Sequence, residues 1–323
     1  MCIRDRFNDT SSSQTINFHI PLGTKDQYIS KFAQDILGTN ITANWISYIQ
    51  WSITNDGLIS PADKRQIQGE ITIPDTVDEK VVTGIAESAF NGCSALTSVN
   101  FAEGSKLNSI GKYAFSECAS LTSVNIPSSV TTINDGTFAE CSSLTSITIP
   151  RSVTSIADYA FADCSSLTNI TFAEGSKLTS IGVQAFSKCA LTSINIPNSV
   201  TRIDTNAFRN CSSLKDVTFN WNEEQLNKLQ LDNSLFINHT SSQTIIFHIP
   251  WGTKDQYKAK FTQDILGTNI TANWIYDIVP PTPTPTNSSN LALILGLTFG
   301  FIILIGIGSY LGYRYYKHRK NRK

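Results

Sequence analysis

The chain has 323 residues, of which 41% are hydrophobic and 16% are charged, with 18 glycines and 11 prolines. These values allow about two domains with a sizeable core and exclude a collagen-like or wholly disordered chain. Six of the 25 basic residues lie among the last eleven positions, so the rest carries 19 basic against 26 acidic residues, a net charge of −7. Because nucleic-acid binding needs a basic surface, we expect no nucleic-acid partner.

A long segment near the N-terminus occurs twice in the chain. Residues 7–46 return at positions 236–275 with most residues unchanged. Each copy has a strand-like IxFHIP run, a glycine turn and an amphipathic helix predicted to begin near Lys25 or Lys254. The first copy, predicted to be a cap-like module, has no repeat array before it, which suggests a truncated chain or a piece of a longer alternating protein. Residues 1–6 fit neither repeat, are left unassigned and need not be native.

Residues 47–88 are predicted to form an N-terminal cap and the first strand of a repeat array. Asn55, Asp56 and Gly57 have the residue types of a hairpin turn. The GEITIP run at residues 69–74 alternates apolar and polar residues, which predicts the first strand of the array.

Six short repeats of 22 to 25 residues fill residues 89–219. In each, a phenylalanine is followed three residues later by cysteine and then by an L-x-x-V/I-x-I/F run, and an isoleucine row precedes the next phenylalanine. Two units read FAEGSKL (residues 101–107 and 172–178) where others have a turn two residues shorter, IPSSV or IPRSV. This spacing is typical of leucine-rich repeats, whose units bury their apolar faces by stacking. The sequence predicts a leucine-rich repeat solenoid with one parallel β-strand per coil and a row of buried phenylalanines: Phe90, Phe115, Phe138, Phe161, Phe186 and Phe208.

The C-terminal part is predicted to contain a cap, a stalk and a membrane anchor. Residues 220–278, with a helix at 223–231 and the second copy of the long segment, are predicted to cover the last coil. The Pro/Thr-rich residues 279–290 predict an extended stalk. No charge occurs from Leu291 to Leu311, which predicts a single transmembrane helix at residues 291–312 in contact with membrane lipid.

The basic residues 313–323 predict the orientation of the chain in the plasma membrane. By the positive-inside rule this tail is cytosolic, and the part before the helix is an ectodomain outside the cell. Such a single-pass topology normally needs an N-terminal apolar segment, and the sequence has none, which is a second indication of truncation.

The repeated cysteines allow three interpretations: a disulfide ladder, a metal site or core packing. Their spacing of 22 to 25 residues does not match zinc patterns. Stacked coils would bring equivalent cysteines close enough to pair, but their side chains would point in parallel, which favours buried thiols that pack as small hydrophobes. Cys2 has no assignment. His19 and His248, equivalent in the two long copies, are interpreted as structural.

Catalytic and cofactor-binding motifs are missing from the sequence. It contains no HExxH, CxxC, GxSxG or P-loop pattern. We therefore expect neither enzyme activity nor a bound cofactor or metal ion.

Polar residues between the buried positions of the L-x-x-V-x-I runs are the predicted binding residues. Stacked coils would align them into a nearly uncharged row of hydroxyls and amides, here called the polar strip, that could bind an extracellular protein or glycan. Ordinary solvation of strands explains the same residue types, and the sequence does not separate the two interpretations. The polar strip comprises Ser98, Asn100, Ser123, Asn125, Ser146, Thr148, Asn169, Thr171, Ser193, Asn195, Asp216 and Thr218.

Seven N-x-S/T sequons are candidate glycosylation sites if the chain faces outward, although such motifs also arise by chance in sequence rich in Ser, Thr and Asn. Asn169 lies on the polar strip. Either it is unmodified and the strip binds, or it is glycosylated and binding moves to the edges, the convex side or the caps. The sequons are at Asn8, Asn40, Asn169, Asn210, Asn238, Asn269 and Asn287.

The recurring order of Phe, Cys, LxxVxIP and SVTxI resembles the BspA-like leucine-rich repeat surface proteins of host-associated bacteria and trichomonad parasites. The similarity runs from Ile71 to Phe219, and the FHIPxGTKDQY run is similar to the cap of such arrays. The stalk, single membrane helix and short basic tail resemble the trichomonad branch. The usual asparagine after the strand is replaced by Ser/Pro-rich segments. The resemblance implies attachment at the cell surface to host cells, matrix proteins or other microbes, and no catalytic residues.

Three hypotheses on function follow, led by a membrane-anchored, adhesin-like binding protein. The second is a surface receptor that would need a signalling partner, since its tail is too short for a signalling domain. The third is a structural or immune-decoy coat protein without a dedicated ligand.

Overall fold

The computed structural model describes residues 14–21, 41–238 and 242–276. The chain divides into two units, Met1–Asp277 and Ile278–Lys323, and every described residue belongs to the first. Residues 1–6, the predicted stalk, the predicted membrane helix from Leu291 to Leu311 and the basic tail lie outside the described residues. Within the described part, no helix has the length and apolar character needed to cross a membrane.

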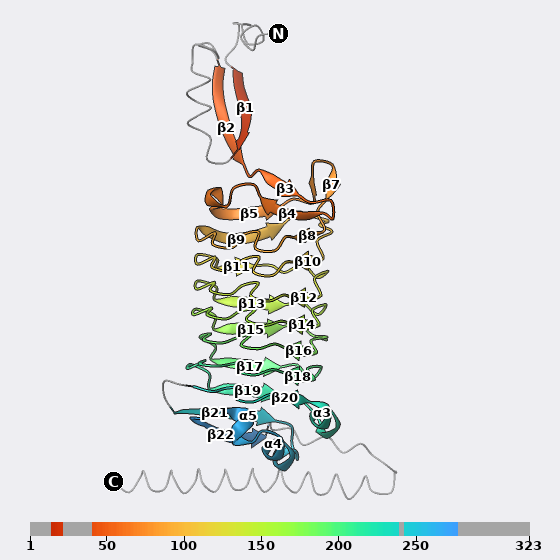
Figure 1. Cartoon of the computed structure of the whole chain (residues 1–323), viewed down its shortest axis with the longest axis vertical. Coiled ribbons are helices and arrows are strands. Elements are labelled where there is room, and N and C mark those ends of the chain that lie inside the picture. The colour runs from red at the N-terminus through yellow and green to blue at the C-terminus, as the bar shows by residue number, and fades with distance from the viewer. Residues whose placement is uncertain (1–13, 22–40, 239–241, 277–323) are drawn as a thin grey trace, which may run out of the picture. The chain divides into compact units, whose positions relative to one another are not determined.

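The L-x-x-V-x-I runs form the main stack of strands (Figure 1). Its strands are β5 (Gly69–Ile73), β9 (Leu96–Phe101), β11 (Ser123–Val124), β13 (Ser146–Ile149), β15 (Asn169–Phe172), β17 (Ser193–Ile196), β19 (Asp216–Phe219), β21 (Gln243–Ile249) and β22 (Ile270–Tyr276). They pair in parallel in three groups, β5–β9–β11, β13–β15 and β17–β19–β21–β22. Valine and isoleucine side chains face the core and the residues between them face outward, as the two-residue period of a strand requires. The predicted parallel leucine-rich repeat solenoid is confirmed.

A second stack of short strands runs along another side of the coils, so the prediction of one strand per coil was wrong. Its strands are β4 (Leu58–Pro61), β8 (Gly84–Ile85), β10 (Ser109–Ile110), β12 (Thr132–Ile133), β14 (Ser155–Ile156), β16 (Ser180–Ile181), β18 (Arg202–Ile203) and β20 (Gln230–Leu231). They pair in parallel through the isoleucine row in two groups, β4–β8–β10 and β12–β14–β16–β18–β20. Two-residue strands are too short to show an alternating pattern, so the sequence predicts the buried row but not its pairing.

The region before the repeats begins with a hairpin. β3 (Trp51–Ile53) pairs antiparallel with β4, and Gly57 in the connecting turn has a φ of +79°. The predicted hairpin turn is confirmed. β5 pairs in parallel with β9, so the GEITIP run is the first strand of the main stack, as predicted.

A second, smaller hairpin departs from the parallel pairing expected from Ile71 to Phe219. β6 (Thr76–Val77) and β7 (Lys80–Val81) pair antiparallel. Asp78 and Glu79 between them have φ angles of +49° and +64°, and a type I′ turn requires positive φ at both central residues. Because Asp-Glu is not a typical sequence for such a turn, the sequence does not predict this hairpin.

The segment around each repeat phenylalanine closes the coil and bonds it to the next one. The backbone N–H of Phe138 donates to the Ala160 carbonyl at 2.8 Å. Gly136 and Glu140, two residues before and after it, have φ angles of +56° and +60°. This region is unfavourable for a residue with a Cβ, but it turns the Glu140 N–H toward the Ala162 carbonyl of the next coil, at 2.7 Å. The same pattern recurs around the other repeat phenylalanines.

One phenylalanine ring per coil forms a continuous stack in the core. All six predicted rings are fully buried. Successive ring centroids are 5.1–5.5 Å apart, with interplanar angles of 2–12°. Trp51 lies edge-on at one end of the stack, 6.1 Å from Phe90, and Phe236 extends the other end, 5.2 Å from Phe208. The predicted phenylalanine core is confirmed.

The repeat cysteines are buried free thiols, which confirms the core interpretation. They also form hydrogen bonds that the sequence did not predict. The Cys141 Sγ donates to the Phe115 carbonyl of the preceding coil at 3.1 Å, and the Cys164 Sγ donates to the Phe138 carbonyl at 3.0 Å. The same contact recurs at Cys118, Cys189 and Cys211.

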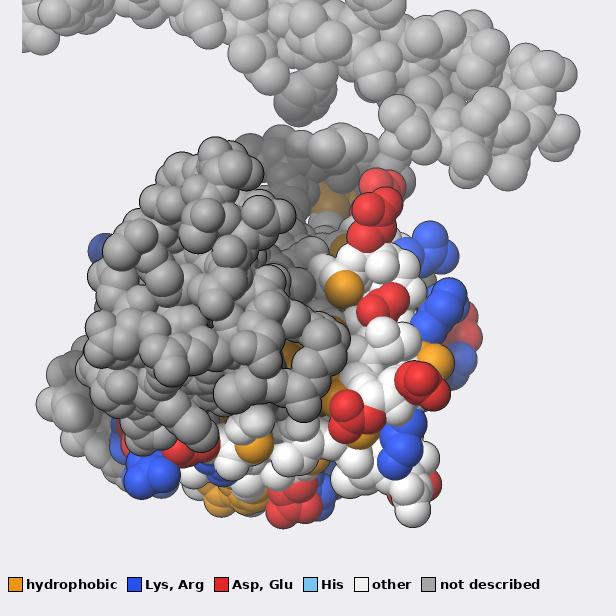
Figure 2. Space-filling view, turned by 90° about the horizontal axis from the view of Figure 1, so that it is seen from above, with side chains coloured by type: hydrophobic (Ala, Val, Ile, Leu, Met, Phe, Trp, Pro, Cys, Tyr) orange, Lys and Arg blue, Asp and Glu red, His pale blue; other side chains and the backbone are white. Residues whose placement is uncertain are grey.

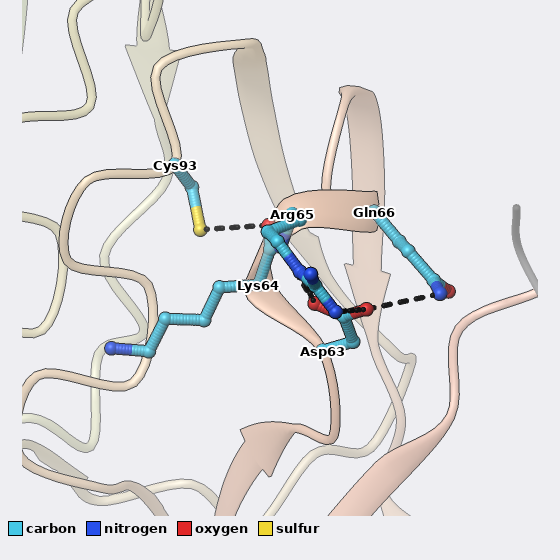
Figure 3. Close-up of polar contacts among 5 residues, drawn as sticks. All are labelled: Asp63, Lys64, Arg65, Gln66 and Cys93. Carbon is cyan, nitrogen blue, oxygen red and sulfur yellow. Dashed lines mark hydrogen bonds and ion pairs between the residues drawn. The ribbon is translucent and has the colours of Figure 1, made fainter.

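A short 3-10 helix, η2 (Lys64–Gln66), completes this row of thiols at its N-terminal end. The Cys93 thiol has no preceding phenylalanine and instead donates to the Lys64 carbonyl at 3.6 Å (Figure 3). Asp63 caps the helix: its carboxylate accepts the backbone N–H of Arg65 at 3.1 Å and the side-chain amide of Gln66 at 3.2 Å. The cap therefore fixes the carbonyl that Cys93 uses.

The second copy of the long segment continues the main stack after the last repeat. α3 (Glu223–Lys228) begins with a capping box between Asn222 and Gln225 and ends earlier than predicted, because the next residues join β20. α4 (Lys254–Lys260) begins where a helix was predicted, and α5 (Gln263–Leu266) follows it. The Tyr257 hydroxyl donates to the Trp221 carbonyl at 2.9 Å, inside an aromatic cluster over the last coil.

The first copy of the long segment contains the same strand pair. β1 (Gln14–Pro21) pairs in parallel with β2 (Ile41–Tyr48) in the register that β21 and β22 adopt. The helix predicted near Lys25 lies outside the described residues.

The buried thiols predict that the array loses stability at high pH. Burial raises the pKa of Cys93 to about 11 and that of Cys164 to about 12. An unfolded thiol ionises near pH 8.5, so the stabilisation is fully present below that pH and is lost as pH rises toward 12. Denaturant unfolding of the purified chain should show a free energy that falls above about pH 9, by up to ~1.4 kcal/mol per pH unit for each thiol. In Cys164→Ala the fall in unfolding free energy per pH unit should be smaller by the contribution of one thiol. An unchanged slope would contradict the account.

Candidate functional site

The polar strip lies on the exposed side of the main stack. Nine of its twelve residues are exposed, and Ser98, Asp216 and Thr218 are half-buried. The residues between them are core: Ile147 and Ile194 are each 3% exposed. The predicted alternation is therefore present in the structure, whereas the predicted binding role stays a prediction.

Strand register aligns the strip residues in rows across neighbouring coils. Ser123 is paired with Ser98, Ser146 with Asn169, and Ser193 with Asp216. The second row contains the pairs Thr148 with Thr171 and Asn195 with Thr218. Each strip position in these pairs thus lies beside the equivalent position of the neighbouring coil, as stacking of the repeats predicts.

Hydrogen bonds occupy the ends of the strip more than its middle. At one end Asn100 donates to the Glu70 carboxylate, and at the other the His248 Nε2 lies 3.2 Å from the Asp216 Oδ1. Asp216, the only charged residue of the strip, thus has a partner, and His248 has the structural role expected of it. Four side chains in the middle of the strip form no hydrogen bond with any other described residue: Ser123, Asn125, Ser146 and Thr148.

A row of threonines beside the strip uses its hydroxyl groups within the protein. The Thr122 Oγ1 donates to the Thr97 carbonyl at 3.0 Å, and the Thr168 Oγ1 donates to the Thr145 carbonyl at 3.2 Å. These hydroxyls bond coil to coil, whereas those of the strip face solvent. Charged side chains of both signs are interspersed elsewhere, on the visible part of the end-on surface (Figure 2).

Two recesses adjoin the strip where the longer FAEGSKL turns occur, a feature that sequence reasoning missed. Each lies between one such turn and the shorter proline turn of the next coil. The first recess, of about 420 Å³, is lined by Asn100, Phe101, Ser105, Asn125, Pro127 and Ser128, among others. The second, of about 520 Å³, is lined by the equivalent Thr171, Phe172, Ser176, Asn195, Pro197 and Asn198, among others. The two additional residues per turn are visible in the sequence, but the hollow they leave is not.

The sequons differ in exposure. Asn169 is exposed on the strip, and Asn269 is exposed with its Nδ2 donating to the Asn238 carbonyl at 3.0 Å. Asn210 is half-buried, and Asn238 is 1% exposed. Asn8, Asn40 and Asn287 lie outside the described residues. Glycosylation at any of these sites stays a prediction.

Metal-binding groups are dispersed in the described part of the chain. There, no cluster of three or more His, Cys, Asp or Glu side chains could hold a metal ion. The thiols, which are the strongest ligands available, are buried and hydrogen-bonded to carbonyl groups.

The repeats match a known family model, described as "BspA type Leucine rich repeat region", in six copies over residues 66–175 and 132–251. The chain belongs to the BspA-type leucine-rich repeat family. The resemblance inferred from the Phe, Cys and LxxVxIP pattern is confirmed. The comparison with curated proteins gives no match.

Solved structures of leucine-rich repeat proteins are similar to this BspA-type chain. A leucine-rich cell surface protein of Faecalibacterium prausnitzii is 24% identical over 62% of this chain and 69% of its own, with a TM-score of 0.47. The leucine-rich repeat protein of T. pallidum is 23% identical over 71% of this chain and 97% of its own, with a TM-score of 0.40. A leucine-rich repeat protein of Bacteroides ovatus is 23% identical over 72% of this chain and 78% of its own, with a TM-score of 0.27. Similarity at this level says nothing of what this chain binds.

Proposed function

We propose that this chain is a membrane-anchored surface protein that binds an extracellular protein or glycan through the polar strip, and so attaches its cell to host cells, matrix or other microbes. The observation that carries the proposal is the alignment of the strip, in which equivalent hydroxyl and amide groups face solvent in register. No catalytic step and no nucleic-acid partner are part of the proposal.

The physical properties of the strip suit binding. Uncharged donors and acceptors can exchange water for a polar ligand without the large desolvation cost of buried charges. Parallel strand pairing and the stacked phenylalanine rings of the core hold the coils that carry the strip rigid. A rigid surface loses little conformational entropy when a ligand binds.

The proposed location is the plasma membrane, with the repeats outside the cell. The uncharged run from Leu291 to Leu311 is long enough to cross a bilayer core of about 30 Å, and six basic residues follow it. Positive-inside orientation then leaves the polar strip accessible to extracellular ligands.

Bulky charge placed on the strip should abolish attachment. In cells that display the chain, Ser146→Arg and Ser193→Arg should each remove adhesion to the surface that the wild type binds, with unchanged melting temperatures because both positions are exposed. Thr131→Arg, at an exposed position outside the strip, is the matched control and should adhere like the wild type. Full adhesion of both strip variants would remove the strip as the binding surface.

Glycopeptide mass spectrometry at Asn169 completes this experiment. An unmodified Asn169 is expected if the centre of the strip binds. High occupancy at Asn169 together with full adhesion would move binding to the edges, the convex side or the caps.

The membrane topology predicts which epitopes are accessible on intact cells. Antibodies against tags inserted before Pro280 should label intact cells, and antibodies against a tag after Tyr313 should label them only after permeabilisation. Deletion of residues 291–323 should release the chain into the medium when a signal sequence is supplied. Labelling of the tail on intact cells would contradict the orientation.

A further inference from the structure

The two recesses are equivalent features built at two places in the array. Each follows a strand of the main stack that ends in phenylalanine, β9 at Phe101 and β15 at Phe172. These strands are three coils apart, which corresponds to about 14 Å along the stack. The same chemical groups therefore recur twice on one face.

The longer turn explains why a hollow forms at these coils. In the turn after β9, the Ser105 N–H donates to the Ala102 carbonyl at 3.1 Å, and Gly104 has a φ of +75°. Gly175 in the equivalent turn has a φ of +68°. Each FAEGSKL turn extends by two residues beyond the IPxS turn of the next coil, and the recess lies between the two turns.

The phenylalanine in each recess is incompletely covered. Other coils have isoleucine at this position, and Ile126 and Ile149 are 4% and 0% exposed. Phe219 also occupies it but is fully buried by the aromatic residues of the C-terminal part. Phe101 and Phe172 remain half-buried and line the recesses.

The polar groups of the lining are amides and hydroxyls, apolar residues such as Pro127 and Pro197 complete it, and no charged side chain lines either recess. In the second recess the Asn220 Nδ2 donates to the Asn195 Oδ1 at 2.8 Å, so the Nδ2 of Asn195 is directed to solvent or a ligand. Asn125, its equivalent in the first recess, has an exposed amide. An aromatic surface beside uncharged donors and acceptors matches a sugar ring, which has an apolar C–H face and a rim of hydroxyl groups.

We propose that the two recesses are sugar-binding subsites that take neutral hexose or N-acetylhexosamine residues of a glycan. Each phenylalanine contacts the apolar face of the ring, and the neighbouring asparagine bonds its hydroxyl or acetamido groups. This inference rests on the proposed function, since both asparagines belong to the polar strip, and it names the ligand class. Volumes of about 420 and 520 Å³ lie within the range of small-ligand sites.

The observations favour a sugar over a peptide. Peptides commonly bind by adding a strand to an open sheet edge, which needs a row of unpaired backbone groups. The recesses lie at the end of strands already paired on the stack and are formed mainly by side chains and turns. Two subsites on one rigid face would also bind a branched or repeating glycan with an avidity above that of either site.

The experiment compares matched variants of the full chain on an array of neutral, sialylated and sulfated oligosaccharides, followed by calorimetric titration with the neutral oligosaccharide of strongest signal. Phe101→Ile and Phe172→Ile introduce the residue that other coils carry, so core packing is retained. Thr131→Ala, at an exposed position outside the polar strip and outside both recesses, is the control. Melting temperatures verify that every variant is folded.

The wild type should bind neutral oligosaccharides at two sites per chain. Each single variant should retain one site, the double variant should bind at least ten-fold more weakly, and Thr131→Ala should bind like the wild type. Binding only of charged glycans, or equal binding by the double variant, would overturn the inference. Loss of cell adhesion in Ser146→Arg without any glycan binding by the wild type would overturn the sugar subsites while leaving the proposed function intact.

Discussion

The stacking of one phenylalanine ring per coil is the interaction on which the rest of the structure depends. Ring centroids repeat every 5.1–5.5 Å, slightly more than the spacing of about 4.8 Å between paired strands, so the rings are offset as stacked aromatic pairs prefer. From the second ring onward, the thiol three residues after the ring donates to the phenylalanine carbonyl of the preceding coil. Rings and thiols together hold neighbouring coils in one register, which places strip residues beside their equivalents.

Such a stack needs an ending at each side, because every coil contacts only its neighbours. At the first coil, Trp51 covers Phe90, and the Lys64 carbonyl accepts the Cys93 thiol. At the last repeat, Phe236 extends the ring stack. The Gln243 side-chain amide donates to the Cys211 carbonyl at 3.1 Å. The second long copy therefore continues both the core and the hydrogen bonding of the array before its aromatic cluster closes it.

The sequence predicted the features that repeat, because six copies show which positions keep the same residue types. The phenylalanine row, the buried cysteines and the alternation within the polar strip were all predictable from spacing and residue type. The thiol hydrogen bonds were not predictable. A buried cysteine gives the same sequence pattern whether it only packs as a hydrophobe or also donates to a carbonyl. The second strand stack escaped prediction because two residues such as Ser155 and Ile156 are too short to show a period.

Features that depend on the fit between unlike coils were also beyond the sequence. Each recess lies where a FAEGSKL turn meets a shorter turn of the next coil, and neither turn alone indicates a hollow. The hairpin at Asp78 and Glu79 depends on two positive φ angles at residues that rarely adopt them. The contact between Asp216 and His248 joins the last repeat to the second long copy. Because these two segments follow different sequence patterns, neither pattern predicts a contact between them.

Thiol labelling of the folded, purified chain under non-reducing conditions tests the central claim most directly. Iodoacetamide reacts with the thiolate, so buried cysteines with raised pKa values should resist it. The account predicts that the buried thiols are unpaired, stay unlabelled in the native protein, and become reactive together as denaturant unfolds the array: Cys118, Cys141, Cys164, Cys189 and Cys211. A disulfide between any two of these five, or labelling of any of the five in the native chain at the rate of a free thiol, would contradict the account.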